Sequence, residues 1–170
     1  MRLIVLGAGG FGKTIADIAD QLQAYDEIKH LDDMSNSEGV IGKISDLEKF
    51  INDDTAFFSA IGDNSFRCEL IERIQTLGGK VVSVIHPSAY ISPTVKMERG
   101  VAILPHSSIG TNVVIGAGCI INMNATIDHD CILEDGVHIA PGAIVKGENH
   151  LPAYTKIESG IVVERGQYQE

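Results

Sequence analysis

From Ile85 onward, every sixth residue of the chain is aliphatic. The series has fourteen members and no insertion: Ile85, Ile91, Met97, Ile103, Ile109, Ile115, Ile121, Ile127, Leu133, Ile139, Val145, Leu151, Ile157 and Val163. Four residues after each member, small residues hold a second line until Asn149 and Gln167 interrupt it. A six-residue repeat of this length is typical of a left-handed parallel β-helix, in which three hexads form one triangular coil. We therefore predict such a β-helix over residues 85–170.

Residues 1–84 follow a different pattern, in which short apolar runs alternate with segments of helical periodicity. Strands are expected at 2–7, 27–33, 55–62 and 80–85, and helices at 12–23, 45–51 and 64–78. Ser45 is expected to cap the second helix, with Glu48 completing a capping box. Alternating strands and helices indicate a parallel sheet with crossover helices, so this part is predicted to be a small Rossmann-like α/β domain.

The segment "GAGGFGKT" at residues 7–14 matches two phosphate-loop patterns at once. The Walker pattern uses Gly7, Gly12, Lys13 and Thr14, and the dinucleotide pattern uses Gly7, Gly9 and Gly12. A Walker site requires a Mg²⁺-binding acid on a larger nucleotide-hydrolase sheet. Only Asp63 is a candidate for that acid, and the α/β part is too short for such a sheet, so ATP hydrolysis is disfavoured.

The dinucleotide pattern has better support, because the loop follows a strand and opens a helix whose N–H groups can bind a phosphate. Asp32 ends the second predicted strand, where an acid can bind a ribose hydroxyl. A full dinucleotide needs two mononucleotide-binding halves, and this domain has one. We therefore expect a nucleotide diphosphate carrying another group, the alternative being a tight turn that binds nothing.

Charge and cysteine content narrow the possible partners. The formal net charge is −10 and Lys or Arg residues form no run, which argues against nucleic acid and anionic membranes. The three cysteines, Cys68, Cys119 and Cys131, form no CxxC pair and are expected to be buried thiols in a reducing compartment. Neither a signal peptide nor an apolar run of membrane-spanning length is present, so a soluble, cytoplasmic protein is expected.

His129 is the strongest candidate for a catalytic base, since imidazole titrates near neutral pH. Residues 18 apart stack in neighbouring coils, which places Thr111 on one side of His129 and Gly147 on the other. Gly147 would leave space for an acyl group, and its backbone N–H could stabilise an oxyanion. Asp130 stacks on Asn112 and can orient the imidazole. The alternative is a surface His–Asp pair at a corner of the β-helix.

The combined pattern resembles the bacterial sugar acyltransferases, the family of sialic acid O-acetyltransferases and UDP-amino-sugar N-acetyltransferases. The matching segments are "GAGGFGK" at 7–13, "LDD" at 31–33, "AIGDNSFR" at 60–67, "IHPSA" at 85–89 and "NMNATIDHDCILEDGVHIAPGA" at 122–143. The resemblance implies that His129 is the general base and Asp130 its partner. It also implies an active homotrimer, with acetyl-CoA in the groove between neighbouring β-helices.

The same resemblance implies a nucleotide-sugar site in the N-terminal domain. Its expected residues are Gly9, Gly10, Phe11, Asp32, Asp33, Gly62 and Asn64. Many relatives carry His where this chain has Phe11, and their C-terminal coils, which line the CoA groove, differ from residues 148–170 here.

The remaining histidines receive weaker assignments. His138 is expected to stack over Lys156 and to face the donor groove. His106 is expected to stack with Asn124, while His86 and His150 are expected to be solvated. A zinc site like that of the γ-type carbonic anhydrases is disfavoured by the spacing of the histidines, and no metal is expected.

The predicted function is therefore acetyl transfer from acetyl-CoA to an amino group, or to a hydroxyl group, of a nucleotide-linked sugar. The alternatives are a sialic acid O-acetyltransferase and a non-catalytic trimer that binds a nucleotide sugar but has a shortened donor groove. An NAD-dependent oxidoreductase would require a second nucleotide-binding half.

Overall fold

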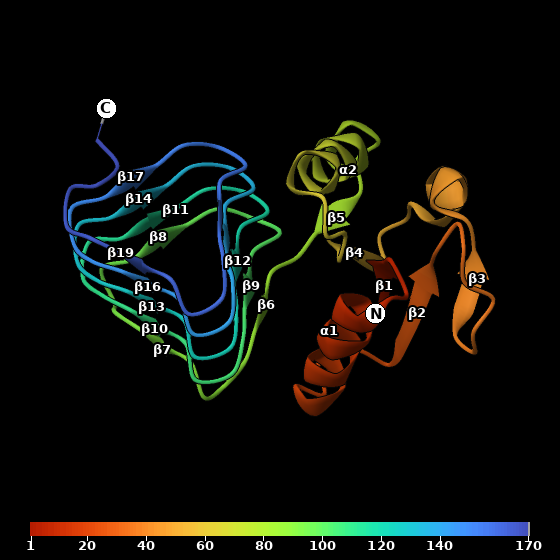
Figure 1. Ribbon diagram of the computed structural model, residues 1–170. Helices are drawn as coiled ribbons and strands as arrows, with labels where there is room; N and C mark the ends of the chain where they lie inside the picture. The colour runs from red at the N-terminus through yellow and green to blue at the C-terminus, as the bar shows by residue number, and fades with distance from the viewer. Residues whose placement is uncertain (170) are drawn as a thin grey trace. The chain divides into compact units, whose positions relative to one another are not determined.

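The structure is a computed structural model that describes residues 1–169 (Figure 1). The chain divides into two compact units between Val84 and Ile85, where the hexads begin. Each unit has its own sheet system and its own hydrophobic core.

The N-terminal unit contains a five-stranded sheet of order β3-β2-β1-β4-β5, in which every pair of strands is parallel. Its elements are β1 (Arg2–Leu6), α1 (Gly10–Gln21), β2 (Glu27–Leu31), β3 (Val40–Gly42), the 3₁₀ helix η1 (Ile44–Phe50), β4 (Thr55–Ser59), α2 (Asn64–Thr76) and β5 (Lys80–Val81). The central strands β1 and β4 are buried along almost their whole length, as expected for a parallel sheet covered on both faces.

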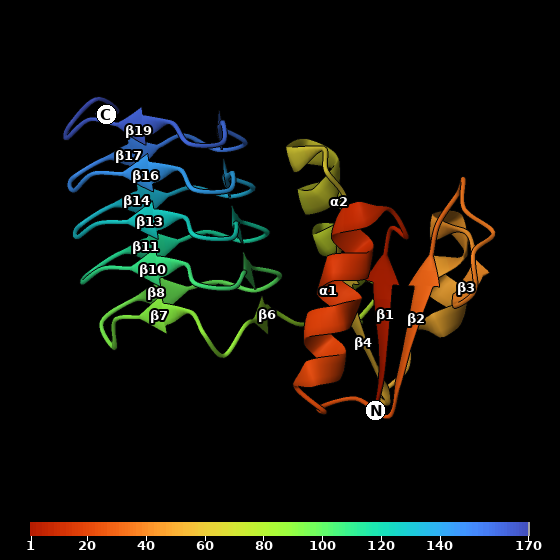
Figure 2. The same ribbon diagram turned by 60° about the horizontal axis from the view of Figure 1, so that its bottom comes forward.

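The two faces of this sheet pack against different helices. Phe57 lies in a buried cluster with residues of η1 and α2, including Leu47 and Ile74. The side chain of Phe58 points to the opposite face, since successive side chains of a strand alternate, and it contacts Phe11 of α1. Figure 2 shows α1 alongside β1 in front of the sheet.

Three elements of the structure differ from the prediction. The helix at 45–51 is wrong in type and start: η1 is a 3₁₀ helix capped at Lys43, with Asp46 instead of Glu48 in the capping box. Its first turn is held by Asp33, which accepts the Ile44 N–H at 2.9 Å, a tertiary contact that local sequence does not reveal.

The single strand predicted at 80–85 is two strands, β5 and β6 (Val84–Ile85). β5 completes the sheet of the N-terminal unit, whereas β6 joins the β-helix, so the two ends of this apolar run belong to different cores. The three-residue strand β3 was not predicted. It is too short for a periodic pattern, and it pairs with β2 through a register shift between His30 and Leu31.

The C-terminal unit is a parallel β-helix of triangular section (Figure 1), which confirms the prediction from the hexads. Its two-residue strands are β6, β7 (Tyr90–Ile91), β8 (Lys96–Met97), β9 (Ala102–Ile103), β10 (Ser108–Ile109), β11 (Val114–Ile115), β12 (Ile120–Ile121), β13 (Thr126–Ile127), β14 (Ile132–Leu133), β15 (His138–Ile139), β16 (Ile144–Val145), β17 (His150–Leu151), β18 (Lys156–Ile157) and β19 (Val162–Val163). Each strand pairs with the strand one coil away, so Ile127 lies between Ile109 and Val145. The aliphatic line of the hexads and the buried thiols of Cys119 and Cys131 form the core.

The backbone at the corners of the β-helix also repeats every six residues. From residue 100 to residue 166, every sixth residue has a positive φ. These residues are Gly100, His106, Asn112, Gly118, Asn124, Asp130, Gly136, Gly142, Glu148, Tyr154, Gly160 and Gly166. Glycine, asparagine and aspartate tolerate this conformation best, so the coil itself dictates the backbone at Asp130.

Candidate active site

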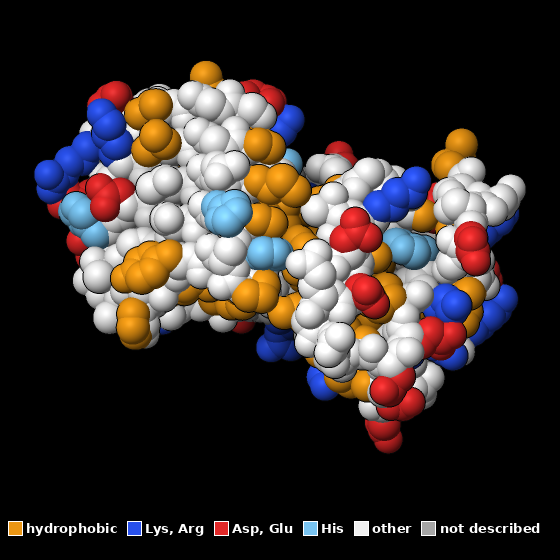
Figure 3. Space-filling view, turned by 90° about the horizontal axis from the view of Figure 1, so that it is seen from below, with side chains coloured by type: hydrophobic (Ala, Val, Ile, Leu, Met, Phe, Trp, Pro, Cys, Tyr) orange, Lys and Arg blue, Asp and Glu red, His pale blue; other side chains and the backbone are white. Residues whose placement is uncertain are grey.

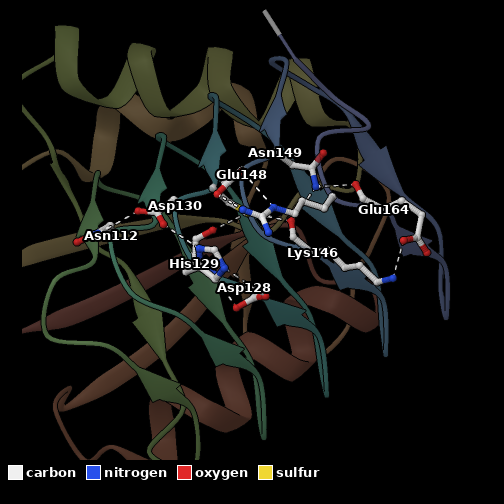
Figure 4. A network of polar contacts seen from close by, with 10 residues as sticks. Asn112, Asp128, His129, Asp130, Lys146, Glu148, Asn149 and Glu164 are labelled. Atoms are coloured by element: carbon white, nitrogen blue, oxygen red, sulfur yellow. Dashed lines mark hydrogen bonds and ion pairs between the residues drawn. The ribbon is translucent and has the colours of Figure 1, made fainter.

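His129 lies at the corner between β13 and β14, flanked by two carboxylates (Figure 4). Its Nδ1 is 2.8 Å from Oδ2 of Asp130, and its Nε2 is 4.0 Å from Oδ2 of Asp128. The amide of Asn112, one coil earlier, donates to Oδ1 of Asp130 at 3.0 Å. Both oxygens of Asp130 are therefore engaged, and the carboxylate holds the imidazole by Nδ1 while Nε2 is left for another partner.

The surrounding charges shift both members of this pair. The hydrogen bond to Asp130, reinforced by the charge of Asp128, raises the pKa of His129 above its ordinary value. The hydrogen bond from Asn112, followed by that from His129, lowers the pKa of Asp130. Asp130 is therefore ionised when it orients the imidazole. The His129 side chain is 39% exposed, so a substrate can reach it.

Gly147 lies directly over His129 in the next coil. A β-carbon at Gly147 would stand 2.9 Å from both Cε1 and Nε2 of His129, so no other residue fits there without moving the ring. The predicted stacking is confirmed, but the free space is occupied by the imidazole itself and not left open for an acyl group. Among residues 1–169, no acceptor binds the Gly147 N–H.

Arg165, one coil beyond Gly147, is the positively charged residue at this corner. The guanidinium of Arg165 binds both carboxylate oxygens of Glu148, with Nε 3.0 Å from Oε2. Its positive charge lowers the pKa of His129 and so opposes the two aspartates. Neither Asp128 nor Arg165 was predicted as a site residue, although another step of 18 residues from Gly147 leads to Arg165.

The other histidines occupy different places. His138 faces outward on β15, in register with Lys156 as predicted, with Nε2 3.2 Å from the amide of Asn122. This strand belongs to the sheet opposite the His129 corner, so one chain does not bring the two histidines together. The prediction that His150 is solvated is wrong: its side chain is 21% exposed, and Nε2 lies 2.8 Å from Glu134, which reaches it from the preceding coil.

In the N-terminal unit, the predicted nucleotide residues follow the carboxyl ends of β1, β2 and β4, which lie at one edge of the parallel sheet. Gly9 and Gly10 are exposed at the start of α1. Gly12 permits a close turn, since a β-carbon there would be 2.1 Å from the Gly7 carbonyl oxygen. Phe11 is half-buried and packs edge-on against Phe58, with ring centroids 6.5 Å apart.

Asp32 anchors this glycine loop. Its Oδ2 accepts the Ala8 N–H at 2.7 Å, and its Oδ1 accepts the N–H groups of Met34 and Ser35. These hydrogen bonds, that from Ala8 foremost, lower the pKa of Asp32. A cavity of about 230 Å³ opens beside it, lined by Asp32, Asp33, Ser35, Asn36, Val40, Gly42 and Lys43.

The buried guanidinium of Arg67 anchors the loop after β4 by hydrogen bonds. Arg67 is 0% exposed; its guanidinium donates to the Ile61 carbonyl at 2.9 Å and to Oδ1 of Asn64 at 2.8 Å. Gly62, between them, is exposed. Arg67 was not predicted as a site residue, because nothing in a helical pattern marks an arginine as buried.

The part of the chain that the structure describes contains no helix long and apolar enough to cross a membrane. Nor do three or more His, Cys, Asp or Glu side chains converge there in a way that could hold a metal ion.

Comparison with known proteins identifies the family. Residues 2–74 match the model of the PglD N-terminal domain, and residues 112–147 match that of the bacterial transferase hexapeptide. The acetyltransferase domain of PglB from Neisseria gonorrhoeae, solved with acetyl coenzyme A, is 34% identical, with a TM-score of 0.92 over 98% of this chain and 82% of that one. The chain belongs to the bacterial sugar acyltransferase family. Its β-helix is accordingly left-handed, and the predicted fold class is confirmed.

Two more members of this family are similar over nearly the whole of this chain. GDP-perosamine N-acetyltransferase from Escherichia coli O157:H7 is 27% identical over 95% of this chain and 77% of its own. A perosamine N-acetyltransferase from Caulobacter crescentus, solved as a histidine-to-asparagine variant with CoA and GDP-perosamine, is 26% identical with a TM-score of 0.82. The latter match covers 97% of this chain and 89% of that one.

Proposed function

We propose that this protein transfers an acetyl group from acetyl-CoA to the amino group of a nucleotide-linked sugar. The observation that carries the proposal is the His129 corner, where Asp130 holds Nδ1 of a partly exposed imidazole. Gly147 stacks over this ring, and its N–H binds no acceptor among residues 1–169. Relatives that bind acetyl-CoA and GDP-perosamine support both substrates.

In the proposed reaction, the sugar amine attacks the thioester carbonyl carbon of acetyl-CoA. Nε2 of His129 removes a proton from the attacking nitrogen, and the Gly147 N–H donates to the oxyanion of the tetrahedral intermediate. Collapse of this intermediate breaks the C–S bond, and the CoA thiolate takes a proton from the His129 imidazolium. The products are the N-acetylated sugar and CoA with a free thiol.

The nucleotide diphosphate would lie against the N-terminal unit. The first N–H groups of α1, after Gly9 and Gly10, are suited to a phosphate, because an α-helix presents unpaired donors and a positive dipole end there. The cavity beside Asp32 and Asp33 is suited to a ribose or base, and Gly62 and Asn64 provide the remaining edge. Phe11 would contribute an apolar surface, not a polar contact, to the sugar.

The proposal includes a homotrimer with acetyl-CoA between neighbouring β-helices. His138 lies on the sheet opposite the His129 corner, so the two can share a site only across a chain boundary. Large apolar side chains also remain exposed on the faces that flank this corner: Tyr90, Val114, Ile132, Ile144 and Val162. Figure 3 shows hydrophobic side chains on the surface of the β-helix unit.

The structure also bears on the alternative of a non-catalytic binding protein with a shortened donor groove. Residues 148–169 continue the β-helix through β17, β18 and β19, so the coils above His129 are present to line a donor site. This observation favours an enzyme.

The test is a turnover assay with acetyl-CoA and a panel of UDP-, GDP- and CMP-linked sugars that carry either a free amine or only hydroxyl groups. Release of the CoA thiol measures the rate of transfer. Transfer to an amine is expected, and His129→Ala should reduce it by roughly 10²–10⁴-fold, the usual contribution of a positioned base. Transfer to hydroxyl acceptors alone would instead indicate an O-acetyltransferase. Binding of a nucleotide sugar without any turnover would favour the non-catalytic alternative.

A further inference from the structure

Asn149 interrupts the line of small residues, yet it lies inside the β-helix with 1% of its surface exposed. Its Nδ2 donates to the carbonyl oxygens of Lys146 at 2.7 Å and Glu164 at 2.9 Å. Its Oδ1 accepts the Tyr168 N–H at 2.9 Å. The buried amide therefore has partners on both sides, and the interruption in the sequence has a structural use.

One of these bonds acts on the proposed oxyanion donor. The Lys146 carbonyl and the Gly147 N–H belong to the same peptide unit, and in a planar trans peptide the two groups point in opposite directions. The thiol of Cys131, buried one coil below Asn149, also approaches the Lys146 oxygen, at 3.3 Å. With its carbonyl held toward the interior by two buried donors, Asn149 (Figure 4) and Cys131, this peptide directs the Gly147 N–H outward. The His129 ring lies against the same glycine, 2.9 Å from where its β-carbon would stand.

One interior column lies behind the His129 corner. It contains the buried residues Val113, Cys131 and Asn149, so it gains hydrogen-bonding side chains in the coils of His129 and Gly147. The neighbouring column contains Ala125 and Ala143 in the corresponding coils. A core that needed only packing would have no use for an amide here, because a buried amide is costly unless it is hydrogen-bonded.

We propose that Asn149 is a positioning residue for catalysis, which orients the Lys146–Gly147 peptide so that the Gly147 N–H faces the developing oxyanion. This inference rests on the proposed acetyl transfer and assigns to it a residue that touches neither substrate. Since an oxyanion forms only in the transition state, Asn149 should affect kcat and leave the KM of either substrate unchanged.

The test compares three substitutions at this position. Asn149→Ala removes every donor. Asn149→Cys supplies a thiol for the Glu164 carbonyl, because Cys119 and Cys131 each donate to the carbonyl 15 residues ahead, that of Glu134 and of Lys146. Asn149→Ser supplies a hydroxyl. Ser107 shows that a serine at a small position can make this bond, because its Oγ donates to the carbonyl of Leu104, three residues back, at 2.8 Å. All three substitutions lose the bond from Tyr168, and only Asn149→Ser keeps a donor for the Lys146 carbonyl, so its difference from the other two reports on that carbonyl.

We expect kcat to fall by about 10- to 10²-fold in Asn149→Ala, less than the 10²- to 10³-fold loss of a whole oxyanion donor. Asn149→Ser should stay closest to the unmutated enzyme, and the kcat of Asn149→Cys should fall about as far as that of Asn149→Ala. Ser107→Ala is the matched control: it loses the same kind of interior bond at another corner, so its melting temperature should fall while kcat is unchanged. An unchanged kcat in Asn149→Ala, an equal loss in Asn149→Ser, or an effect on KM alone would overturn the inference.

A crystal structure of Asn149→Ala gives a second readout that needs no activity. The Lys146 carbonyl should have turned away from the interior, and a peptide unchanged from the unmutated protein would refute the positioning role. Should Asn149→Ala fail to fold, Asn149→Cys and Asn149→Ser provide the same comparison. Absence of turnover in the unmutated protein would refute the acetyl transfer itself, whereas the crystal structures would still decide the orientation of the peptide.

Discussion

The imidazole of His129 occupies the space that a side chain at Gly147 would need, with Cε1 and Nε2 both 2.9 Å from the position of a β-carbon there. The hexapeptide repeat makes these two residues neighbours, one coil apart. The glycine carries the proposed oxyanion donor and the histidine is the proposed base. A substitution at Gly147 should therefore change the position of the His129 ring.

Gly147→Ala should therefore displace the His129 ring and reduce kcat by about 10- to 10²-fold, part of what outright loss of a general base costs. Steady-state kinetics with both substrates measures this effect. Nucleotide-sugar binding by calorimetry should be unchanged, because the glycine loop belongs to the other unit. Full activity in Gly147→Ala would show that the ring can move without consequence and would argue against its role as base.

The pH profile should report the charges around His129. The imidazole acts as a base only when neutral, so kcat/KM should rise with pH through a pKa that Asp130 and Asp128 hold above the ordinary value. Asp128→Asn removes a negative charge and should move this rise to lower pH. Arg165→Gln removes the opposing positive charge and should move it to higher pH. Shifts in the same direction for both variants would contradict this assignment.

Mixed trimers should reveal a site shared between chains. We expect His129→Ala and His138→Ala each to reduce transfer severely, the second mainly through weaker use of acetyl-CoA. When the two variants are co-expressed, about a quarter of the sites in randomly assembled cyclic trimers would combine both intact histidines, and activity should return to that extent. Sedimentation must first show a trimer at micromolar concentration. No recovery in verified mixed trimers would place His138 outside the site.

Asp32→Asn should weaken nucleotide-sugar binding without affecting acetyl-CoA. The carboxylate accepts N–H groups of Ala8, Met34 and Ser35, and a neutral amide offers only one oxygen for them. We expect the Kd of the sugar nucleotide to rise about 10-fold, in line with the 1.5–3 kcal/mol typical of a hydrogen bond to a charged group. Calorimetry with each ligand separately measures both effects, and a comparable loss for acetyl-CoA would point to a general folding defect.

The sequence alone determined the β-helix and the stacking of the proposed catalytic corner. A strict period of six leaves no choice of register, since a slip by one residue would turn the whole aliphatic line outward. For this reason the stacking of His129 with Gly147, of Asp130 with Asn112 and of His138 with Lys156 could all be read by steps of 18 residues.

Only the tertiary structure decided what depends on contacts between segments distant in the sequence. η1 starts where Asp33 reaches across to the Ile44 N–H, and the apolar run at 80–85 divides because its ends enter different cores. No periodic pattern in the sequence predicts that Arg67 is buried, that His150 binds Glu134 or that Asn149 bonds to the Lys146 carbonyl. A repeat specifies which residues stack, whereas the direction of a polar side chain depends on which donors and acceptors the folded chain places within hydrogen-bonding distance.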